Sequence, residues 1–153
     1  MIPSALYHQA AVANYILAEP LDVIGLFAQA HHENAGAIVL FSGEVRNNHK
    51  GKEVIFLEYE AKASMANKMI EAILKEATER FDLFVAMAIH RIGKVAVSEP
   101  AVVVITAAGH RKESYEANQF IIDKIKHEVP IWKCEIFADG TKLWGGNCNC
   151  TTH

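Results

Sequence analysis

The stretch 101–137, AVVVITAAGHRKESYEANQFIIDKIKHEVPIWKCEIF, decides the fold. Its first seven residues, 101–107, form an apolar run that is typical of a buried strand. Apolar residues then recur at helical spacing over 112–128, and Pro130 ends this pattern. A last strand is expected over 131–137. The stretch therefore predicts a strand, an amphipathic helix and a second strand.

A similar pattern precedes this one in the chain. Glu53–Glu60 contains the β-branched and aromatic residues of a strand. A 3.6-residue apolar period predicts an amphipathic helix over Ser64–Arg80, and Leu83–Ile92 is apolar enough for a buried strand. Two strand-helix-strand units of this kind bury their helices on a sheet. We therefore predict an α/β (α+β) domain with two layers.

The N-terminal third of the chain gives weaker signals. Residues 5–17 mix apolar and polar side chains and are expected to form one or two strands. Pro20 is typical of a helix start, and we expect a first helix over 20–33. The run Ile38–Phe41 predicts a short strand, followed by a long exposed loop over Ser42–Lys52.

Length and composition favour one domain, because 153 residues with 51% hydrophobic content suffice for a single core. We expect this domain to cover residues 1–146 and a disordered tail to cover 147–153. The formal net charge of −3 lacks the basic excess of proteins that bind nucleic acids or acidic membranes non-specifically. The chain shows neither a membrane-length apolar run nor a signal-peptide pattern, so we expect a cytoplasmic protein.

Three cysteines, Cys134, Cys148 and Cys150, lie within the last twenty residues. This odd and clustered set is unlike a disulfide framework, so we expect reduced thiols. Cys148, Cys150 and His153 could be read as a soft-metal site, but two thiols and one imidazole leave a tetrahedral zinc one ligand short. The alternative, a polar tail that contains thiols, fits better. No phosphate-binding loop or dinucleotide-binding glycine pattern is present, and we expect neither metal nor cofactor.

The junction between the strand and the helix of the opening stretch carries His110 and Arg111 directly after Gly109. Free N–H groups and the positive end of the helix dipole meet an imidazole and a guanidinium there, which favours a phosphate or carboxylate ligand. A solvated polar turn accounts for the same residues equally well.

Three further cations lie near apolar residues or in a glycine-containing loop. Lys126 falls at the margin of the buried helical stripe, and Lys133 follows Trp132. Loss of hydration would lower the pKa of such a lysine and let it act as acid, base or nucleophile, although many such lysines only extend their ammonium groups into water. Arg46 follows a strand, where a cleft residue or a plain surface charge is possible. We predict that all five cations gather into one anion-binding catalytic site.

Six ordered segments between Gly36 and Trp144 resemble one known family, the large, catalytic subunit of molybdopterin synthase. The segments are residues 36–47 (GAIVLFSGEVRN), 57–59 (LEY), 89–93 (IHRIG), 109–111 (GHR), 116–123 (EANQFIID) and 129–133 (VPIWK).

The resemblance implies a hammerhead-like fold and a central homodimer with one small subunit at each end, a heterotetramer. In the family, a small ubiquitin-like partner carries a thiocarboxylate on its C-terminal Gly-Gly tail. The large subunit transfers that sulfur to cyclic pyranopterin monophosphate, and two transfers make the dithiolene of molybdopterin. This implies a sulfurtransferase of molybdenum cofactor biosynthesis.

By the same resemblance, Arg46, His110 and Arg111 would hold the substrate phosphate, with help from the backbone of Glu44 and Val45. A phosphate and a thiocarboxylate are both anions, so cations that orient them agree with this chemistry.

Lys126 and Lys133 would be the catalytic lysines and would also contact substrate, with Cys134 and Glu135 beside them. We assign proton transfer or charge stabilisation to Lys126 and the partner's thiocarboxylate to Lys133, although the two roles could be interchanged. The sulfur would come from the partner, so no cysteine of this chain is needed as a nucleophile. The chain departs from the family at Glu44, where a basic residue is common, and at Cys134, where arginine is common.

Two functions of other classes remain as alternatives. A non-catalytic module could hold an anionic metabolite or a partner's C-terminal tail without turnover. RNA binding by a ferredoxin-like sheet is a weaker alternative, because an aromatic RNP1-type strand is missing and the net charge is acidic.

Overall fold

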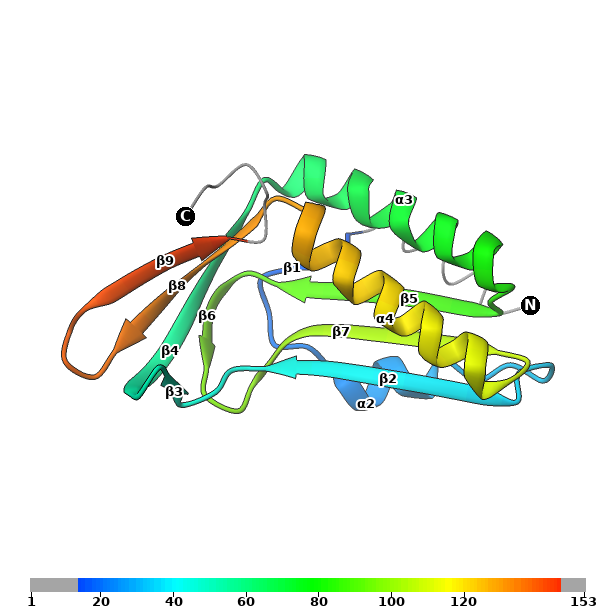
Figure 1. Cartoon of the computed structure of the whole chain (residues 1–153), viewed down its shortest axis with the longest axis horizontal. Coiled ribbons are helices and arrows are strands. Elements are labelled where there is room, and N and C mark those ends of the chain that lie inside the picture. Colours follow the sequence, from blue (N-terminus) through cyan, green and yellow to red (C-terminus); the bar gives the residue numbers. More distant parts are fainter. Residues whose placement is uncertain (1–13, 147–153) are drawn as a thin grey trace.

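The chain builds two β-sheets, and the second extends beyond one end of the first (Figure 1). The computed structural model describes residues 14–146. The first sheet has the order β1 (Ile16–Leu17), β5 (Val85–Arg91), β7 (Pro100–Ala108) and β2 (Ala37–Glu44). The second has the order β3 (Asn48–His49), β4 (Lys52–Ala61), β8 (Ile131–Phe137) and β9 (Lys142–Gly146), with β6 (Gly93–Ala96) also paired to β4.

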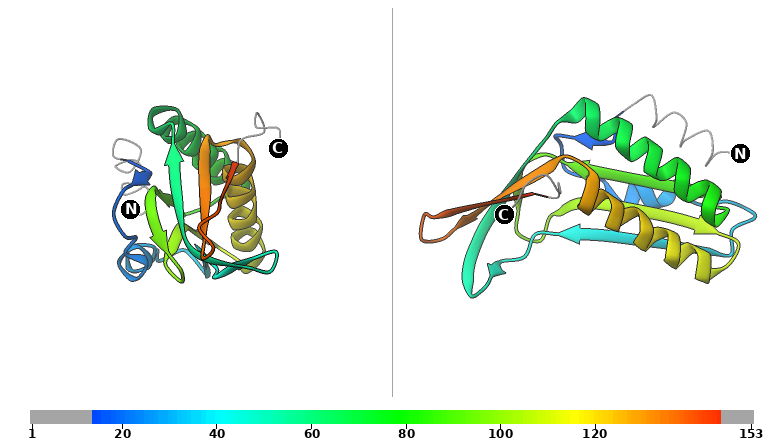
Figure 2. Two further views of the ribbon diagram at one scale, coloured as in Figure 1. Left: turned by 90° about the vertical axis from the view of Figure 1, so that its left-hand side faces the viewer. Right: turned by 45° about the horizontal axis from the view of Figure 1, so that its top comes forward.

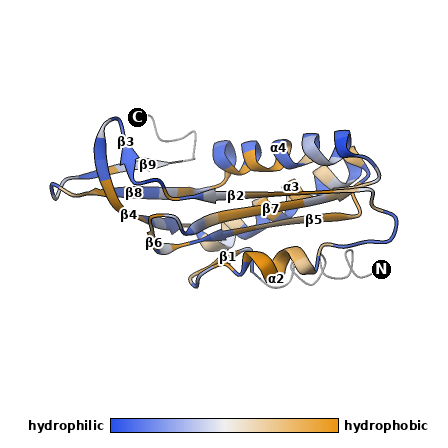
Figure 3. Cartoon of the chain, turned by 90° about the horizontal axis from the view of Figure 1, so that it is seen from below, coloured by the Kyte–Doolittle hydropathy of each residue, from blue (hydrophilic) through white to orange (hydrophobic). Residues whose placement is uncertain are grey.

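Two long helices, α3 (Ala63–Phe81) and α4 (Arg111–Glu128), lie side by side over one face of the first sheet (Figures 1 and 2). Their expected apolar stripes are the buried faces, and each fully buried isoleucine there contributes roughly 2 kcal/mol. The short helix α2 (Val23–Ala28) covers part of the opposite face (Figure 3). The predicted α+β architecture is confirmed, with α2 as an addition to its two layers.

Each long helix connects the two sheets. Helix α3 leads from β4 in the second sheet to β5 in the first, and α4 leads from β7 in the first sheet back to β8 in the second. The two expected strand-helix-strand units are therefore present, but the strands of each unit belong to different sheets. This crossing places the end of α4 at the junction between the sheets.

The end of α4 is set by Pro130. The preceding residue, Val129, has extended backbone angles (φ −79°, ψ 133°), as a residue before proline prefers, so the helix stops and the chain enters β8 directly. The helix itself is held to the sheet by Asn118, whose side-chain amide donates to the carbonyl oxygens of Val39 and Val104, both at 3.1 Å. The last turn of α4 and the start of β8 are therefore fixed next to each other.

Strand β2 ends in a bulge. Its register with β7 shifts between Gly43 and Glu44, and a Cβ atom on Gly43 would lie 2.8 Å from Cγ1 of Val102, so a larger residue does not fit. The bulge redirects the chain toward the second sheet and carries Arg46 with it.

Several element bounds were wrong. The expected helix over 20–33 is only α2, because the Asp22 side chain accepts from the Gly25 N–H at 3.0 Å and starts the helix there, and because the Gln29 N–H closes it on Leu26 at 3.2 Å. The expected loop 42–52 is shorter, since β2 runs to Glu44 and β3 lies within the loop.

Strands β6 and β9 were not predicted at all. Each contains glycine and is short, which hides the apolar alternation of a strand. Of the strand region expected over 5–17, the described part holds β1. The proposed tail 147–153, with Cys148, Cys150 and His153, lies outside the described residues. Within residues 14–146, no helix is long and apolar enough to span a bilayer.

Candidate active site

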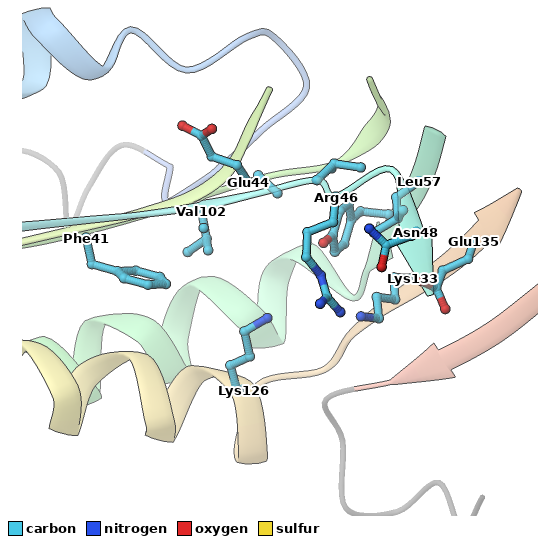
Figure 4. A pocket seen from close by; sticks show the side chains of 13 residues that line it. Phe41, Glu44, Arg46, Asn48, Leu57, Val102, Lys126, Lys133 and Glu135 are labelled. Carbon is cyan, nitrogen blue, oxygen red and sulfur yellow. The ribbon is translucent and has the colours of Figure 1, made fainter. Parts of the chain in front are cut away.

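A polar cavity of about 220 Å³ lies where the first sheet, the second sheet and the end of α4 meet (Figure 4). Strands β2, β4, β7 and β8, helix α4 and the segment after the β2 bulge contribute to its walls. The charged residues that line it are Glu44, Arg46, Lys126, Lys133 and Glu135.

The basic side chains of Arg46, Lys126 and Lys133 point toward one another in the cavity (Figure 4). They come from the segment after β2, the last turn of α4 and β8, which the bulge and Pro130 bring together. Three cations that converge repel one another, and a bound anion would relieve that repulsion. The cavity is therefore suited to an anionic ligand.

Lys126 has a lowered pKa. Lys126 is an exposed residue, but its ammonium end points into the cavity (Figure 4). Desolvation there, followed by the charge of Lys133, lowers the pKa of Lys126. A lysine with a lowered pKa is neutral in a larger fraction of molecules at neutral pH. Lys126 can therefore accept a proton as well as donate one.

The second sheet supplies one wall of the cavity. Lys133 and Glu135 are two residues apart on β8 and share a face, opposite their β4 partners Tyr59 and Leu57. Glu135 is buried, and its carboxylate lies 3.5 Å from Nδ1 of His49. This wall therefore places a carboxylate beside the lysine.

The buried imidazole of His90 packs edge-on against Tyr59, with ring centroids 4.9 Å apart and an interplanar angle of 67°. Its Nδ1 lies 2.8 Å from the Arg91 carbonyl, which can only accept, so Nδ1 carries the hydrogen. Burial, helped by the charge of Lys126, lowers the pKa of His90 to about 4. His90 is therefore neutral at physiological pH and packs against Tyr59, which lines the cavity.

Cys134 does not line the cavity. It lies between Lys133 and Glu135 on β8, and strand alternation turns its side chain to the other face of the sheet, where it is buried. Burial raises the pKa of the Cys134 thiol. This orientation does not favour the expected contact of the Cys134 side chain with substrate, and that contact stays a prediction.

Glu44 and Val45 border the cavity in a different way from the one expected. The Glu44 carboxylate accepts a hydrogen bond from Ser42 at 3.2 Å and points away from the three cations (Figure 4). The backbone N–H of Val45 donates to the Glu99 carbonyl at 3.2 Å. The Val45 amide is therefore already engaged and is not free to donate to a phosphate.

His110 and Arg111 lie at the opposite end of α4 from Lys126. Both are exposed, and Arg111 lies 15 positions before Lys126 in α4, which corresponds to about 22 Å along the helix. His110 is the N-cap residue, and its side chain makes no capping hydrogen bond. One chain therefore does not bring all five predicted cations together: three share the cavity and two lie far from it.

Sequence reasoning gave no role to several cavity residues, among them Tyr59, Asn48 and Phe41. Tyr59 lies two residues after Leu57, and strand alternation predicts that the two share a face. Which face meets the cavity depends on the pairing of β4 with β8, and that pairing joins residues far apart in sequence. Within residues 14–146, no cluster of His, Cys, Asp and Glu has the arrangement of a metal site.

Known proteins are similar to this chain in sequence and in fold. The family model of the MoaE protein matches residues 16–128. The molybdopterin synthase catalytic subunit of Halalkalibacterium halodurans is 40% identical over 132 residues, which cover 86% of this chain and 84% of that protein.

Two solved structures are similar as well. The crystal structure of molybdopterin synthase from Staphylococcus aureus matches with a TM-score of 0.81 and 38% identity, over 87% of this chain and 96% of that one. A protein-protein complex of subunits 1 and 2 of molybdopterin-converting factor from Helicobacter pylori has a chain of the same fold, with a TM-score of 0.70 and 22% identity over 85% and 88% of the two chains. The family model and the 40% identical relative together establish that this chain belongs to the MoaE family.

Proposed function

We propose that this chain is the catalytic subunit of a molybdopterin synthase and acts as a sulfurtransferase in molybdenum cofactor biosynthesis. Its relatives at about 40% identity bear the name of that subunit over most of their length. The observation that carries the proposal is the convergence of Arg46, Lys126 and Lys133 in one cavity (Figure 4). Both reactants in such a reaction, a thiocarboxylate and a cyclic phosphate, are anions that these cations would bind.

The sulfur donor is a small ubiquitin-like partner with a Gly-Gly tail that ends in a thiocarboxylate. A slender glycine tail suits a cavity of about 220 Å³, since it needs no room for side chains. The Helicobacter pylori structure of the same fold is a complex of two different subunits, which supports a partner of this kind. We expect the assembly, a heterotetramer around a central homodimer, to be cytoplasmic.

The chemistry divides between the two lysines. The thiocarboxylate sulfur forms a bond to a carbon of cyclic pyranopterin monophosphate while a carbon–oxygen bond at that carbon breaks and its electron pair stays on the departing oxygen. The partner is then joined to the substrate through an acyl–sulfur bond. Water then adds to the acyl carbon, and the acyl–sulfur bond breaks. The partner leaves as a carboxylate, the sulfur keeps one proton of the water, and the neutral amine of Lys126 takes the other. Lys133 stabilises the negative charge on the acyl oxygen.

His110 and Arg111 enter the site from a second copy of the chain. Within one chain they lie about 22 Å along α4 from Lys126, so they cannot touch the same small molecule. In a homodimer, the start of α4 of each copy could approach the cavity of the other copy. All five cations would then lie in one site. A wider groove of about 630 Å³ between β2 and α4 shares Phe41 and Lys126 with the cavity and leaves room for this approach. The substrate phosphate would then lie between Arg46 of one copy and Arg111 of the other.

Reconstitution tests the proposal. Purified chain, thiocarboxylated partner and cyclic pyranopterin monophosphate should yield molybdopterin. The Lys126→Ala variant should lose roughly 10²- to 10⁴-fold in turnover, because Lys126 transfers a proton. It should keep the thermal unfolding profile of the unmodified chain, because Lys126 is an exposed residue. Lys124→Ala is the matched control: this lysine lies two residues away on α4 and pairs with Glu128 at 3.2 Å.

The same experiment distinguishes the proposed enzyme from the main alternative, a non-catalytic binding module. Tight binding of partner and pterin without any product would indicate a non-catalytic binding module. Near-normal turnover of Lys126→Ala would remove Lys126 from the catalytic machinery.

A further inference from the structure

We propose that the hydroxyl group of Tyr59 is a further catalytic group, which donates a hydrogen bond to the acyl oxygen of the partner's thiocarboxylate. The inference rests on the proposed sulfur transfer and assigns a role to a residue that is not one of the five predicted cations. It follows from the position of the phenol, its free hydroxyl and the groups around it.

Tyr59 lies beside Lys133. The two residues are direct partners in the antiparallel pairing of β4 and β8, their side chains share a face, and both line the cavity. Side chains so paired have Cβ atoms roughly 5 Å apart, so they can contact the same ligand atom. A hydroxyl beside the lysine that binds the partner's acyl group is well placed to bind the same oxygen.

The hydroxyl is available to a ligand. Among the described residues it has no hydrogen-bond partner, although the residue is only 8% exposed. Unlike the Tyr15 hydroxyl, it is not sealed from solvent, and because Tyr59 lines the cavity, a ligand bound there can approach it. A hydroxyl held in a nearly buried site without a partner is a hydrogen-bond donor that only a ligand can satisfy.

The surroundings keep this donor fixed and protonated. β4 is paired on both sides at Tyr59, with Gly93 of β6 and Lys133 of β8, and the ring packs against the imidazole of His90. Burial, together with the charge of Glu135, raises the pKa of Tyr59 to about 12. The phenol therefore stays neutral at physiological pH, and its rotamer needs little ordering when the ligand arrives.

Tyr59 transfers no proton in the reaction. When water adds to the acyl carbon, a carbon–oxygen bond forms and the carbonyl π electrons move to the acyl oxygen, which becomes an oxyanion. That oxyanion accepts hydrogen bonds from the Tyr59 hydroxyl and the Lys133 ammonium group. The electron pair then returns, the acyl–sulfur bond breaks, and the sulfur remains on the pterin. One proton of the water goes to Lys126 and the other to the sulfur.

The Tyr59→Phe variant removes only the hydroxyl and keeps the ring against His90. Assayed in the reconstituted reaction, it should lose roughly 10²- to 10³-fold in kcat, because one donor to an oxyanion contributes on this scale. The covalent adduct of partner and pterin should accumulate and be visible by mass spectrometry of the quenched mixture. Its thermal unfolding should match that of the unmodified chain.

Tyr15→Phe is the matched control. Tyr15 is also buried, its hydroxyl is sealed and unpaired, and it does not line the cavity, so its loss should leave kcat unchanged. A Tyr59→Leu variant separates the ring from the hydroxyl. Normal turnover by Tyr59→Phe together with impaired Tyr59→Leu would show that only the ring matters and would overturn the proposal. Absence of product with the unmodified chain would instead refute the sulfur transfer itself.

Discussion

Lys126, on the last turn of α4, and Lys133, on β8, direct their ammonium groups into one cavity, and the charge of Lys133 is one reason why the pKa of Lys126 is lowered. The two residues are only seven positions apart, but a helix end and a strand start separate them. The two lysines come close together because Pro130 ends the helix and the chain enters β8 directly after it.

This relationship predicts a measurable coupling. Replacing Lys133 with Met should raise the pKa of Lys126, because the nearby positive charge is lost. The pKa should remain below that of an ordinary lysine, because desolvation, the larger cause, persists. NMR titration of ¹³C-labelled lysine side chains would follow this change. Lys124→Met, which removes a lysine paired with Glu128, should leave the Lys126 titration in place. An unchanged Lys126 titration in Lys133→Met would show that the two amines do not interact.

A site shared between two copies predicts complementation. Lys126→Ala and Arg111→Ala should each be impaired as homodimers. Co-expressed, they should form mixed dimers in which one cavity has Lys126 from one chain and Arg111 from the other. With random pairing, half of the dimers are mixed and each has one intact site, so about a quarter of the normal activity should return. Mixtures no more active than the separate variants would place Arg111 outside the active site.

His90 predicts a loss of stability in acid. Its pKa is about 4 in the folded chain and 6.5 as the ordinary value, so between these pH values only the unfolded chain takes up the proton. The free energy of unfolding should therefore fall as the pH drops from 6.5 toward 4, by about 3 kcal/mol from this residue alone. Urea unfolding across this range should show a steeper fall than in His90→Gln, which cannot titrate. The exposed His127 offers a control, since His127→Gln should retain the full pH dependence. Identical slopes for the original chain and His90→Gln would contradict the assignment.

Truncation of the Asn118 side chain should lower the free energy of unfolding considerably. In Asn118→Ala, the carbonyls of Val39 and Val104 lose their hydrogen bonds from the side-chain amide at the interface of α4 with the sheet. We expect a loss of about 2–3 kcal/mol in the free energy of unfolding, measured by urea denaturation. The exposed neighbour Gln119 serves as the control, since Gln119→Ala should change stability by less than about 0.5 kcal/mol. Equal stability of the two variants would mean that Asn118 does not hold α4 in place.

Local sequence patterns determined the elements that have strong periodicity. The apolar stripes of α3 and α4 and the apolar runs of β5 and β7 are continuous in sequence, so the sequence alone identified them. It also singled out Arg46, Lys126 and Lys133, because each is a cation at the end of an element or close to apolar residues. Short strands were not predicted from the sequence. A strand of a few residues that contains glycine, such as β9, is too short to show an apolar alternation.

Only the tertiary structure decided which of these residues meet. Strand alternation turns Cys134 away from the cavity while its neighbours Lys133 and Glu135 face it, and the pairing of β4 with β8 brings Tyr59 next to Lys133. The rigid length of α4 separates Arg111 from Lys126, although both are cations of one helix. Sequence position records the order of residues along the chain, whereas convergence in a site depends on strand register, side-chain direction and helix length. These quantities are set by contacts between segments that lie far apart in sequence.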